Sequence, residues 1–175
     1  LNVVGANPVD HPVHAPYTVA GVTIGDNYWP STGLDEGLSS STDLNVDMIG
    51  TYTYTYTLTD PSGNGPVTAV RTINVGDKIA PVATVDAEDT IVVEVMTKFT
   101  FPKVSYSDNY FKNAELGTEW QGSLMPTINT ERILTKLGIF TLRFVVDDPS
   151  GNVTTVERIV RVGDFTAPEI ELAGE

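Results

Sequence analysis

The sequence predicts an all-β protein built from two tandem β-sandwiches. Two observations predict this architecture: short motifs recur once in the same order along the chain, and several segments between them alternate apolar and polar residues with a period of two. The chain has 175 residues, of which 41% are hydrophobic and 19% are charged, so it can bury a core and is not disordered as a whole.

Three motifs occur twice, and their order is the same in both copies. They are Asp-Asn-Tyr at residues 26–28 and 108–110, Asp-Pro-Ser-Gly-Asn at 60–64 and 148–152, and Val-Gly-Asp followed by Ala-Pro at 75–81 and 162–168. The copies lie 82, 88 and 87 residues apart, which is the length of a small domain. We therefore predict one domain over residues 1–78 and a second over residues 79–166, with residues 167–175 forming the start of a following repeat or a tail.

Residues 51–59 form the clearest strand, because threonine alternates there with tyrosine or leucine. The second copy has an aromatic or aliphatic residue at each matching position of one face. The matching sets are Tyr52, Tyr54, Tyr56 and Leu58 in the first copy and Phe140, Leu142, Phe144 and Val146 in the second. A row of tyrosines can also serve as a stacking platform for sugar rings, but the phenylalanine and valine counterparts favour a face buried in the core.

The Asp-Pro-Ser-Gly-Asn motif follows this strand in both copies and predicts a hairpin loop. Proline presets its own φ, glycine tolerates a positive φ, and Asp and Asn side chains bond the local backbone. Further strands are predicted at residues 67–75, 91–96, 99–106 and 153–162, whereas residues 128–134 fit a strand or a short helix. No long segment has a helical period, so many short strands in about 85 residues indicate a sandwich of the immunoglobulin type.

The charge and composition exclude several classes of function. Acidic residues number 23 and basic residues 10, so the net charge of -13 repels the phosphates of nucleic acids. No apolar run approaches the length of a membrane-spanning helix, which is about 18 residues or more. The chain has no cysteine and therefore has neither disulfides nor thiolate chemistry.

Residues 50–64, the strand at 70–75 and the Asp-x-x-Ala-Pro linker resemble the signature of bacterial immunoglobulin-like surface repeats. This group includes hyalin-repeat-like modules and the immunoglobulin-like modules of pesticidal crystal proteins. The resemblance covers nearly the whole chain, twice, and departs from the pattern between residues 112 and 129, where Trp120 lies in an unusual Glu-Trp-Gln-Gly sequence. It implies an extracellular location at the bacterial cell surface and neighbouring repeats in a longer protein.

The same resemblance implies a non-catalytic module that acts as a stalk or spacer and takes part in adhesion, with a surface glycan or a host or cell-surface protein as its partner. The alternatives are a carbohydrate-binding module of a polysaccharide-capture system and an accessory domain of a secreted hydrolase. No catalytic residue is predicted, since the chain has only two histidines, His11 and His14, near its start. Nearby prolines argue against the helix that favours a two-histidine metal site at this spacing.

The repeated aspartates predict a calcium site. In an immunoglobulin-type sandwich, the loop after the second strand and the loop after the sixth strand lie at the same end. In the second unit Asp108 and Asn109 begin the first of these loops, Asp148 begins the other, and the linker residue Asp77 is expected to approach them. Carboxylate and amide oxygens suit Ca²⁺, which would stiffen this joint. The alternative is that these residues only shape turns.

Four aromatic residues near the Asp-Asn-Tyr motifs are candidate ligand-binding residues: Tyr28, Trp29, Tyr110 and Trp120. Exposed aromatic residues on loops can stack on sugar rings or on a protein partner. The alternative is that each tryptophan packs over the core from its loop. Arg71 and Arg158 hold matching places in the last strand of each unit, where a bond to loop oxygens is expected in preference to ligand binding.

Overall fold

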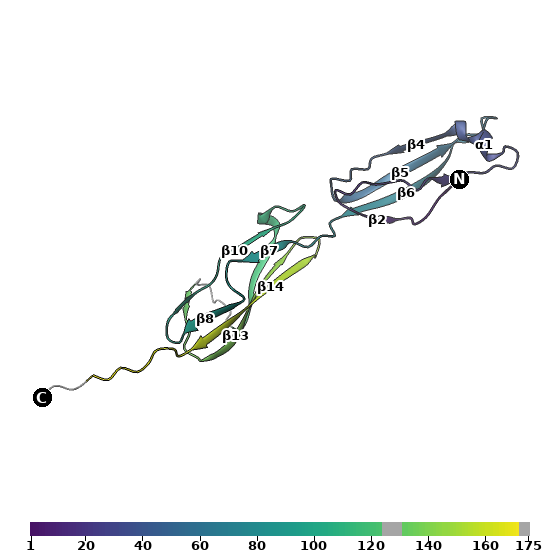
Figure 1. Cartoon of the computed structure of the whole chain (residues 1–175). Coiled ribbons are helices and arrows are strands. Elements are labelled where there is room, and N and C mark those ends of the chain that lie inside the picture. Colours follow the sequence, from purple (N-terminus) through teal and green to yellow (C-terminus); the bar gives the residue numbers. More distant parts are fainter. Residues whose placement is uncertain (124–130, 172–175) are drawn as a thin grey trace. The chain divides into compact units, whose positions relative to one another are not determined.

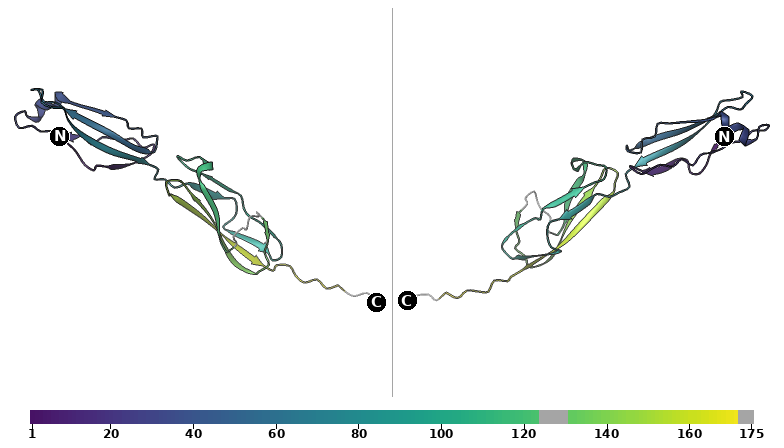
Figure 2. Two further views of the ribbon diagram at one scale, coloured as in Figure 1. Left: turned by 180° about the vertical axis from the view of Figure 1, so that it is seen from behind. Right: turned by 45° about the horizontal axis from the view of Figure 1, so that its top comes forward.

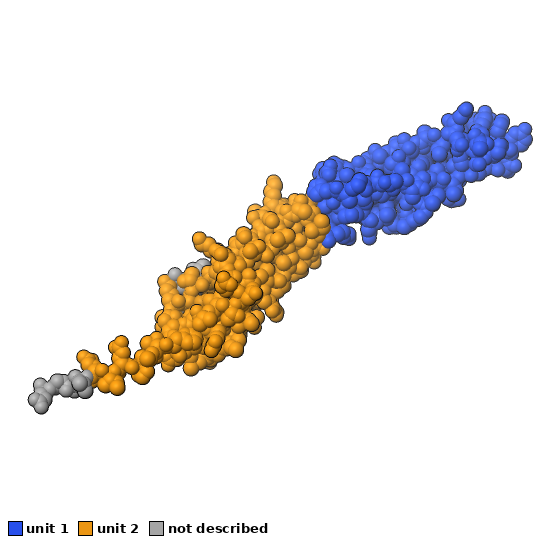
Figure 3. Space-filling view, in the orientation of Figure 1, with its two compact units in different colours: residues 1–78 blue, residues 79–175 orange. Residues whose placement is uncertain are grey.

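The computed structural model describes residues 1–123 and 131–171. The chain divides into two compact units, Leu1–Lys78 and Ile79–Glu175, which Figure 3 draws in different colours. Strands dominate both units (Figure 1). Within the described ranges, no helix combines the length and the apolar character needed to cross a lipid bilayer.

Unit 1 contains one four-stranded sheet and one short two-stranded sheet. The larger sheet has the order β2 (Val9–Pro12), β6 (Val67–Gly76), β5 (Gly50–Leu58) and β4 (Leu38–Thr42), in which β2 and β6 are parallel and the other pairs antiparallel. The smaller sheet pairs β1 (Asn2–Val3) with β3 (Val22–Thr23). A helical turn, α1 (Ser31–Leu34), and the 3₁₀ turn η1 (Asp35–Gly37) lie between β3 and β4.

Unit 2 repeats this plan with more strands in its second layer. Its four-stranded sheet has the order β11 (Gly117–Gly122), β13 (Gly138–Asp147), β14 (Val153–Gly163) and β8 (Thr90–Glu94), and β8 is parallel to β14. The other layer pairs β7 (Val82–Val85) with β10 (Val104–Ser107) and β9 (Lys98–Thr100) with β12 (Glu131–Ile133). The 3₁₀ turn η2 (Asn113–Glu115) precedes β11. Figure 2 shows the layers from two further sides.

The alternating strands bury one face of each large sheet. In unit 1, Tyr56 and Leu58 are buried, and Tyr52 and Tyr54 are half-buried on the same face. The buried residues of the matching hairpin in unit 2 are Leu142, Phe144, Val146, Val160 and Val162. Each such side chain contributes about 1.5–3 kcal/mol through its removal from water. The predicted core face and the predicted fold class, two tandem immunoglobulin-like β-sandwiches, are confirmed.

Two predicted strands differ from the structure. Residues 99–106 are interrupted at residues 101–103, because Pro102 has no N–H for a sheet ladder, and the two halves pair with different strands, β12 and β7. Of residues 128–134, Glu131–Ile133 form β12, and residues 128–130 lie outside the described residues. The segment after Lys112, which departs from the repeat pattern, supplies the edge strand β11 of the large sheet.

An arginine holds the start of each unit to its last strand. Arg71 of β6 is only 2% exposed, and Arg158 of β14 lies at the matching position. The guanidinium of Arg71 donates to the backbone carbonyl oxygens of Val4 and of Ala6, the latter at 2.6 Å. The guanidinium of Arg158 donates to the backbone carbonyl oxygens of Val85 at 3.2 Å and of Ala87 at 3.0 Å. The expected bond of these arginines to loop oxygens is confirmed. The arginines supply hydrogen-bond donors to these partly buried carbonyls, of which that of Val85 also accepts the backbone N–H of Ala87.

Replacing Arg71 by methionine removes these donors and keeps most of the side-chain volume. We expect Arg71→Met to lower the free energy of unfolding of unit 1 by about 2–4 kcal/mol, because two partly buried carbonyls lose their partners. Urea unfolding followed by the fluorescence of Trp29, in a chain that carries Trp120→Phe, measures the loss in unit 1 alone.

The control is Lys78→Met, since Lys78 is an exposed cation of the same unit. Its effect should stay within about 1 kcal/mol. An unchanged unfolding midpoint in Arg71→Met would contradict the role of the arginine as a clamp.

Candidate functional site

The loop end of unit 2 carries the aspartates that the sequence singles out. Asp108 directly follows β10, and its Oδ1 accepts the backbone N–H groups of Tyr110 and Phe111, both at 2.9 Å. This is an Asx turn, in which a side-chain oxygen takes the place of a backbone acceptor. The second oxygen, Oδ2, is closed to solvent and accepts no hydrogen bond from the described residues.

Asp148 directly follows β13 and organises the Asp-Pro-Ser-Gly-Asn loop. Its Oδ1 accepts the backbone N–H of Asn152 at 2.9 Å, and its Oδ2 accepts the side-chain amide of Asn152 at 2.8 Å. The N–H of Gly151, which has a φ of 87°, donates to the backbone carbonyl of Asp148 at 3.0 Å. These bonds hold a carboxylate that is only 3% exposed.

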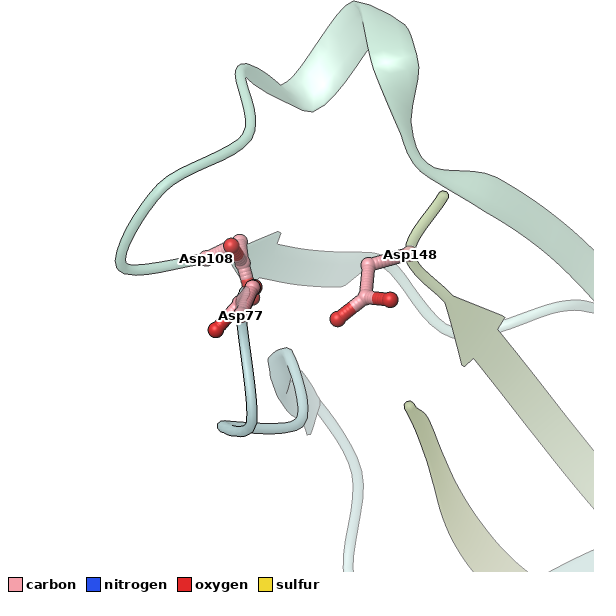
Figure 4. Close-up of side chains that lie close together, drawn as sticks. All are labelled: Asp77, Asp108 and Asp148. Carbon is pink, nitrogen blue, oxygen red and sulfur yellow. The ribbon is translucent and has the colours of Figure 1, made fainter. Parts of the chain in front are cut away.

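Asp77 completes a group of three carboxylates. It follows β6 in the segment that leads to Pro81, and it is 4% exposed. Asp77, Asp108 and Asp148 each offer a carboxylate oxygen, and these oxygens all lie within 4.8 Å of one another (Figure 4). Asn109, the remaining residue of the predicted calcium site, is exposed on the loop that Asp108 begins.

Asp77 and Asp148 are buried and Asp108 is half-buried, and negative charges brought this close repel one another. A hard cation would neutralise such charges, and it takes oxygen ligands. The spacing of the group fits such an ion: ligand oxygens about 2.4 Å from Ca²⁺ lie at most about 5 Å apart. Asp108 keeps one oxygen, Oδ2, without a hydrogen-bond donor among the described residues.

Unit 1 carries the same two loops. Asp26 Oδ1 accepts the backbone N–H groups of Tyr28 and Trp29 at 2.9 and 3.0 Å. Asp60 accepts the backbone N–H and the side-chain amide of Asn64 at 2.8 and 2.7 Å. The hydrogen bonds of these two loops therefore occur in both copies of the repeat. Across the described part of the chain, however, a group of three carboxylates forms at Asp77, Asp108 and Asp148 and nowhere else.

The candidate aromatic residues of unit 1 lie together at the loop end. Tyr28 is 80% exposed and meets the half-buried Trp29 edge to face, with ring centroids 5.2 Å apart. Trp29 donates its Nε1–H to Ser62 Oγ at 3.2 Å, so it contacts the Asp-Pro-Ser-Gly-Asn loop. The pair offers one exposed ring supported by a second ring.

Trp120, by contrast, packs inside unit 2. Its ring centroid lies 5.1 Å from that of Phe144 and 5.8 Å from that of Phe101, and it contacts both core clusters of the unit. The residue that corresponds to Trp29 is Phe111, which follows the half-buried Tyr110 and meets it edge to face at 5.1 Å. Phe111 and Trp29 each directly follow the Asp-Asn-Tyr motif, so the sequence already marks Phe111 as the counterpart of Trp29.

The two histidines take part in separate contacts. His11 Nε2 bonds the carbonyl of Ala15 at 2.9 Å, and its ring stands edge-on to Tyr17. His14 Nδ1 lies 3.1 Å from Asp47 Oδ1. Each imidazole thus has a structural neighbour of its own.

No protein-family model matches the sequence, and no curated protein does. Among solved structures, the chain is similar to the fibronectin(III)-like modules of Clostridium thermocellum CbhA (12% identity, TM-score 0.40, 74% of this chain and 72% of that one). It is also similar to extracellular domains 3–5 of Drosophila OTK (12%, 0.40, 65% and 40%) and to the human desmocollin-1 ectodomain (14%, 0.29, 96% and 42%). Scores at this level carry no functional argument, which comes from the chain's own residues.

The side-chain amide and backbone N–H of Asn64 hold the pKa of the Asp60 carboxyl below its usual value. The ionised carboxylate therefore stabilises unit 1 above the pKa of the unfolded chain, about 3.9, and this contribution is lost as the pH falls through the lower pKa of the folded state. We expect Asp60→Asn to lower the melting temperature of unit 1 near neutral pH and to have a smaller effect at about pH 2.

Thermal melts followed by Trp29 fluorescence measure this difference, because Trp29 bonds the same loop through Ser62. Asp35→Asn, an exposed substitution on η1, serves as the control. A loss of equal size at both pH values would show that the ionised carboxylate is not the cause.

Proposed function

We propose that this chain is a non-catalytic tandem module of a bacterial cell-surface or secreted protein, where it acts as a stalk or spacer that presents an adhesive surface or another domain. The observation that carries the proposal is the parallel pairing of an early strand with the last strand in each unit, β2 with β6 and β8 with β14. The bacterial and surface parts of the proposal rest on the sequence resemblance to bacterial immunoglobulin-like surface repeats.

The chain enters and leaves unit 2 at opposite ends of its sheets. Strand β7 begins at Val82, which pairs with Ser107, the residue before Asp108. Strand β14 starts beside the end of β13 and runs for 11 residues to Gly163, which pairs with Glu94 (Figures 1 and 2). A module with this path can be linked in series without turning the chain back.

A pull on the two ends of unit 2 loads β8 and β14 in opposite directions along their common axis. Hydrogen bonds between strands run across the strands, so this load shears the whole ladder and strains its bonds together. The register joins five residue pairs, from Thr90 with Ile159 to Glu94 with Gly163, and the N–H of Val95 adds a bond of 2.8 Å to the carbonyl of Gly163. Such a ladder suits a module that carries load along its strands.

Single-molecule force spectroscopy tests this role. We expect unit 2 to unfold at a higher force when pulled between positions 79 and 164 than when pulled between positions 79 and 150, because the second geometry peels strands apart bond by bond. The attachment points are Ile79→Cys combined with Asp164→Cys or Ser150→Cys, all at exposed positions of a chain without other cysteines. Equal unfolding forces in the two geometries would argue against a load-bearing role.

The alternative function is a carbohydrate-binding module of a polysaccharide-capture system or an accessory domain of a secreted hydrolase. The observation that favours it is the 80% exposed ring of Tyr28, which Trp29 supports edge to face. Affinity electrophoresis on soluble polysaccharides separates the two functions. Retardation that Tyr28→Ala abolishes supports carbohydrate binding, whereas a spacer passes without retardation.

We also propose that Asp77, Asp108 and Asp148 bind Ca²⁺. The support is the grouping of three carboxylates within 4.8 Å, two of them almost fully buried. The amide oxygen of Asn109 is a further ligand in this proposal. A bound ion ties Asp77 to the loops that begin at Asp108 and Asp148, and thereby stabilises the loop end of unit 2.

Calorimetric titration of the chelator-treated protein with Ca²⁺ tests the site. We expect a binding heat and a stabilisation of unit 2 of about 2.7 kcal/mol when free Ca²⁺ is about 100 times the Kd. Asp77→Asn and Asp108→Asn should abolish both effects, while Asp86→Asn, at an exposed position of the same unit, should leave both intact. If the unchanged protein shows neither heat nor a melting shift, the calcium proposal fails and the spacer proposal is unaffected.

A further inference from the structure

Strand β4 forms one border of the large sheet of unit 1, where it pairs with β5 and with no other strand of the described residues (Figure 1). Gly37 and Asp43, which flank β4, are joined by backbone hydrogen bonds to the β5 segment, so the odd-numbered residues between them also face β5. The backbone N–H and C=O groups of Ser40 and Thr42 therefore point away from the sheet. Such a row of groups is a template for one more strand.

The outer edge of β4 lacks the features that usually keep an edge strand from pairing with another chain. Its sequence, Leu-Ser-Ser-Ser-Thr, contains no charged residue and no proline, and its register with β5 runs over five consecutive pairs. Residues 39–42 are all exposed. The matching edge strand of unit 2, β11, carries a charge at Glu119. The edge of β4 is therefore open to an extended segment.

On its inner face, β4 has a short side chain where unit 2 has a tryptophan. Ser40 pairs with Tyr56 as Trp120 pairs with Phe144, so Ser40 occupies the place of Trp120. The Ser40 Oγ lies 3.4 Å from the hydroxyl of the half-buried Tyr54. Residues that pair across two strands point to the same face of a sheet. The residue opposite Ser40 in an added strand would therefore bring its side chain to the face that carries Tyr54.

Acidic residues flank both ends of β4. Asp35 and Glu36 precede the strand in η1 and Asp43 directly follows it, and all three are exposed. The backbone N–H of Thr53 donates to Asp43 Oδ1 at 2.6 Å and thereby lowers the pKa of that carboxyl, which stays ionised near neutral pH. Unit 1 has eight acidic and two basic residues, and one of the two bases, Arg71, is buried. Charge complementarity therefore favours a basic partner.

We propose that the outer edge of β4 binds an extended basic segment of another protein, which adds a fifth, antiparallel strand to the sheet. Backbone hydrogen bonds to Ser40 and Thr42 hold the segment in register. A large apolar side chain opposite Ser40 packs toward Tyr54, and lysine or arginine residues at the two ends of the segment meet the acidic residues that flank β4. The inference is independent of the spacer, carbohydrate and calcium proposals.

A synthetic peptide with blocked ends, Arg-Lys-Thr-Val-Trp-Val-Thr-Lys-Arg, tests this site on the full chain. Its central tryptophan is placed to lie opposite Ser40. We expect the bound peptide to protect the amide hydrogens of Ser40 and Thr42 from exchange with solvent, as measured by nuclear magnetic resonance of the labelled protein. Protection at these two alternate residues distinguishes strand addition from a general attraction between a basic peptide and an acidic chain.

The control peptide has the same sequence and charge but carries methyl groups on the backbone nitrogens of its tryptophan and its first threonine. In an antiparallel pairing these two nitrogens donate to the carbonyl oxygens of Ser40 and Thr42. Because two hydrogen bonds are lost, we expect the control peptide to bind about tenfold more weakly or worse, as measured by fluorescence anisotropy of the labelled peptides. This comparison leaves the protein unchanged.

Variants of the chain test the same contacts from the other side. Ser40→Pro removes an N–H that faces away from the sheet, which an edge strand tolerates. Asp35→Asn combined with Glu36→Gln removes two of the flanking charges. Both changes should lower the affinity for the unmethylated peptide, whereas Ser41→Ala, an exposed position on the opposite face of the same strand, should not.

Three results would each overturn the proposal. The first is equal affinity for the methylated and unmethylated peptides, which would show that charge alone attracts them. The second is an unchanged affinity in Ser40→Pro or in the double variant. The third is the absence of amide protection at Ser40 and Thr42 at millimolar peptide.

Discussion

Burial of every second side chain along the long hairpin of each unit, β5–β6 and β13–β14, is the constraint on which the rest of the structure depends. Successive side chains of a strand point to opposite faces, so a slip by one residue would expose the whole apolar set. The register that burial selects also decides where each strand ends. Asp60 and Asp148 consequently begin the hairpin loop at the same end of their units, and the loop chemistry follows from core packing.

The same register places an arginine on the inward face of the last strand, opposite Tyr54 in unit 1 and Leu142 in unit 2. A guanidinium in such a place is costly unless its donors are used. The backbone after the first short strand has carbonyl oxygens without strand partners, and the arginine supplies their hydrogen bonds. Arg71 uses both terminal nitrogens in this way, although its Nε has no hydrogen-bond partner among the described residues. Both arginines tie the beginning of each unit to the strand that carries the chain out of it.

Comparison of the two copies shows which aspartates the loops require to form their turns. Asp26 and Asp60 make the same hydrogen bonds as Asp108 and Asp148, so turn formation accounts for two aspartates per unit. It does not account for Asp77, a second buried carboxylate beside Asp148 and the half-buried Asp108. In the proposed calcium site, Asp77 would be a ligand.

The sequence by itself determined the duplication, the alternating core strands, the hairpin loops and the gathering of Asp108 and Asp148 at one end, because period, turn chemistry and the order of strands are local or repeated properties. Only the tertiary structure decided that the strand around Pro102 changes partner and that Trp120 packs against Phe101 and Phe144. Each of these outcomes depends on contacts between residues far apart in the chain, where packing and available space, rather than any short pattern, select the neighbour.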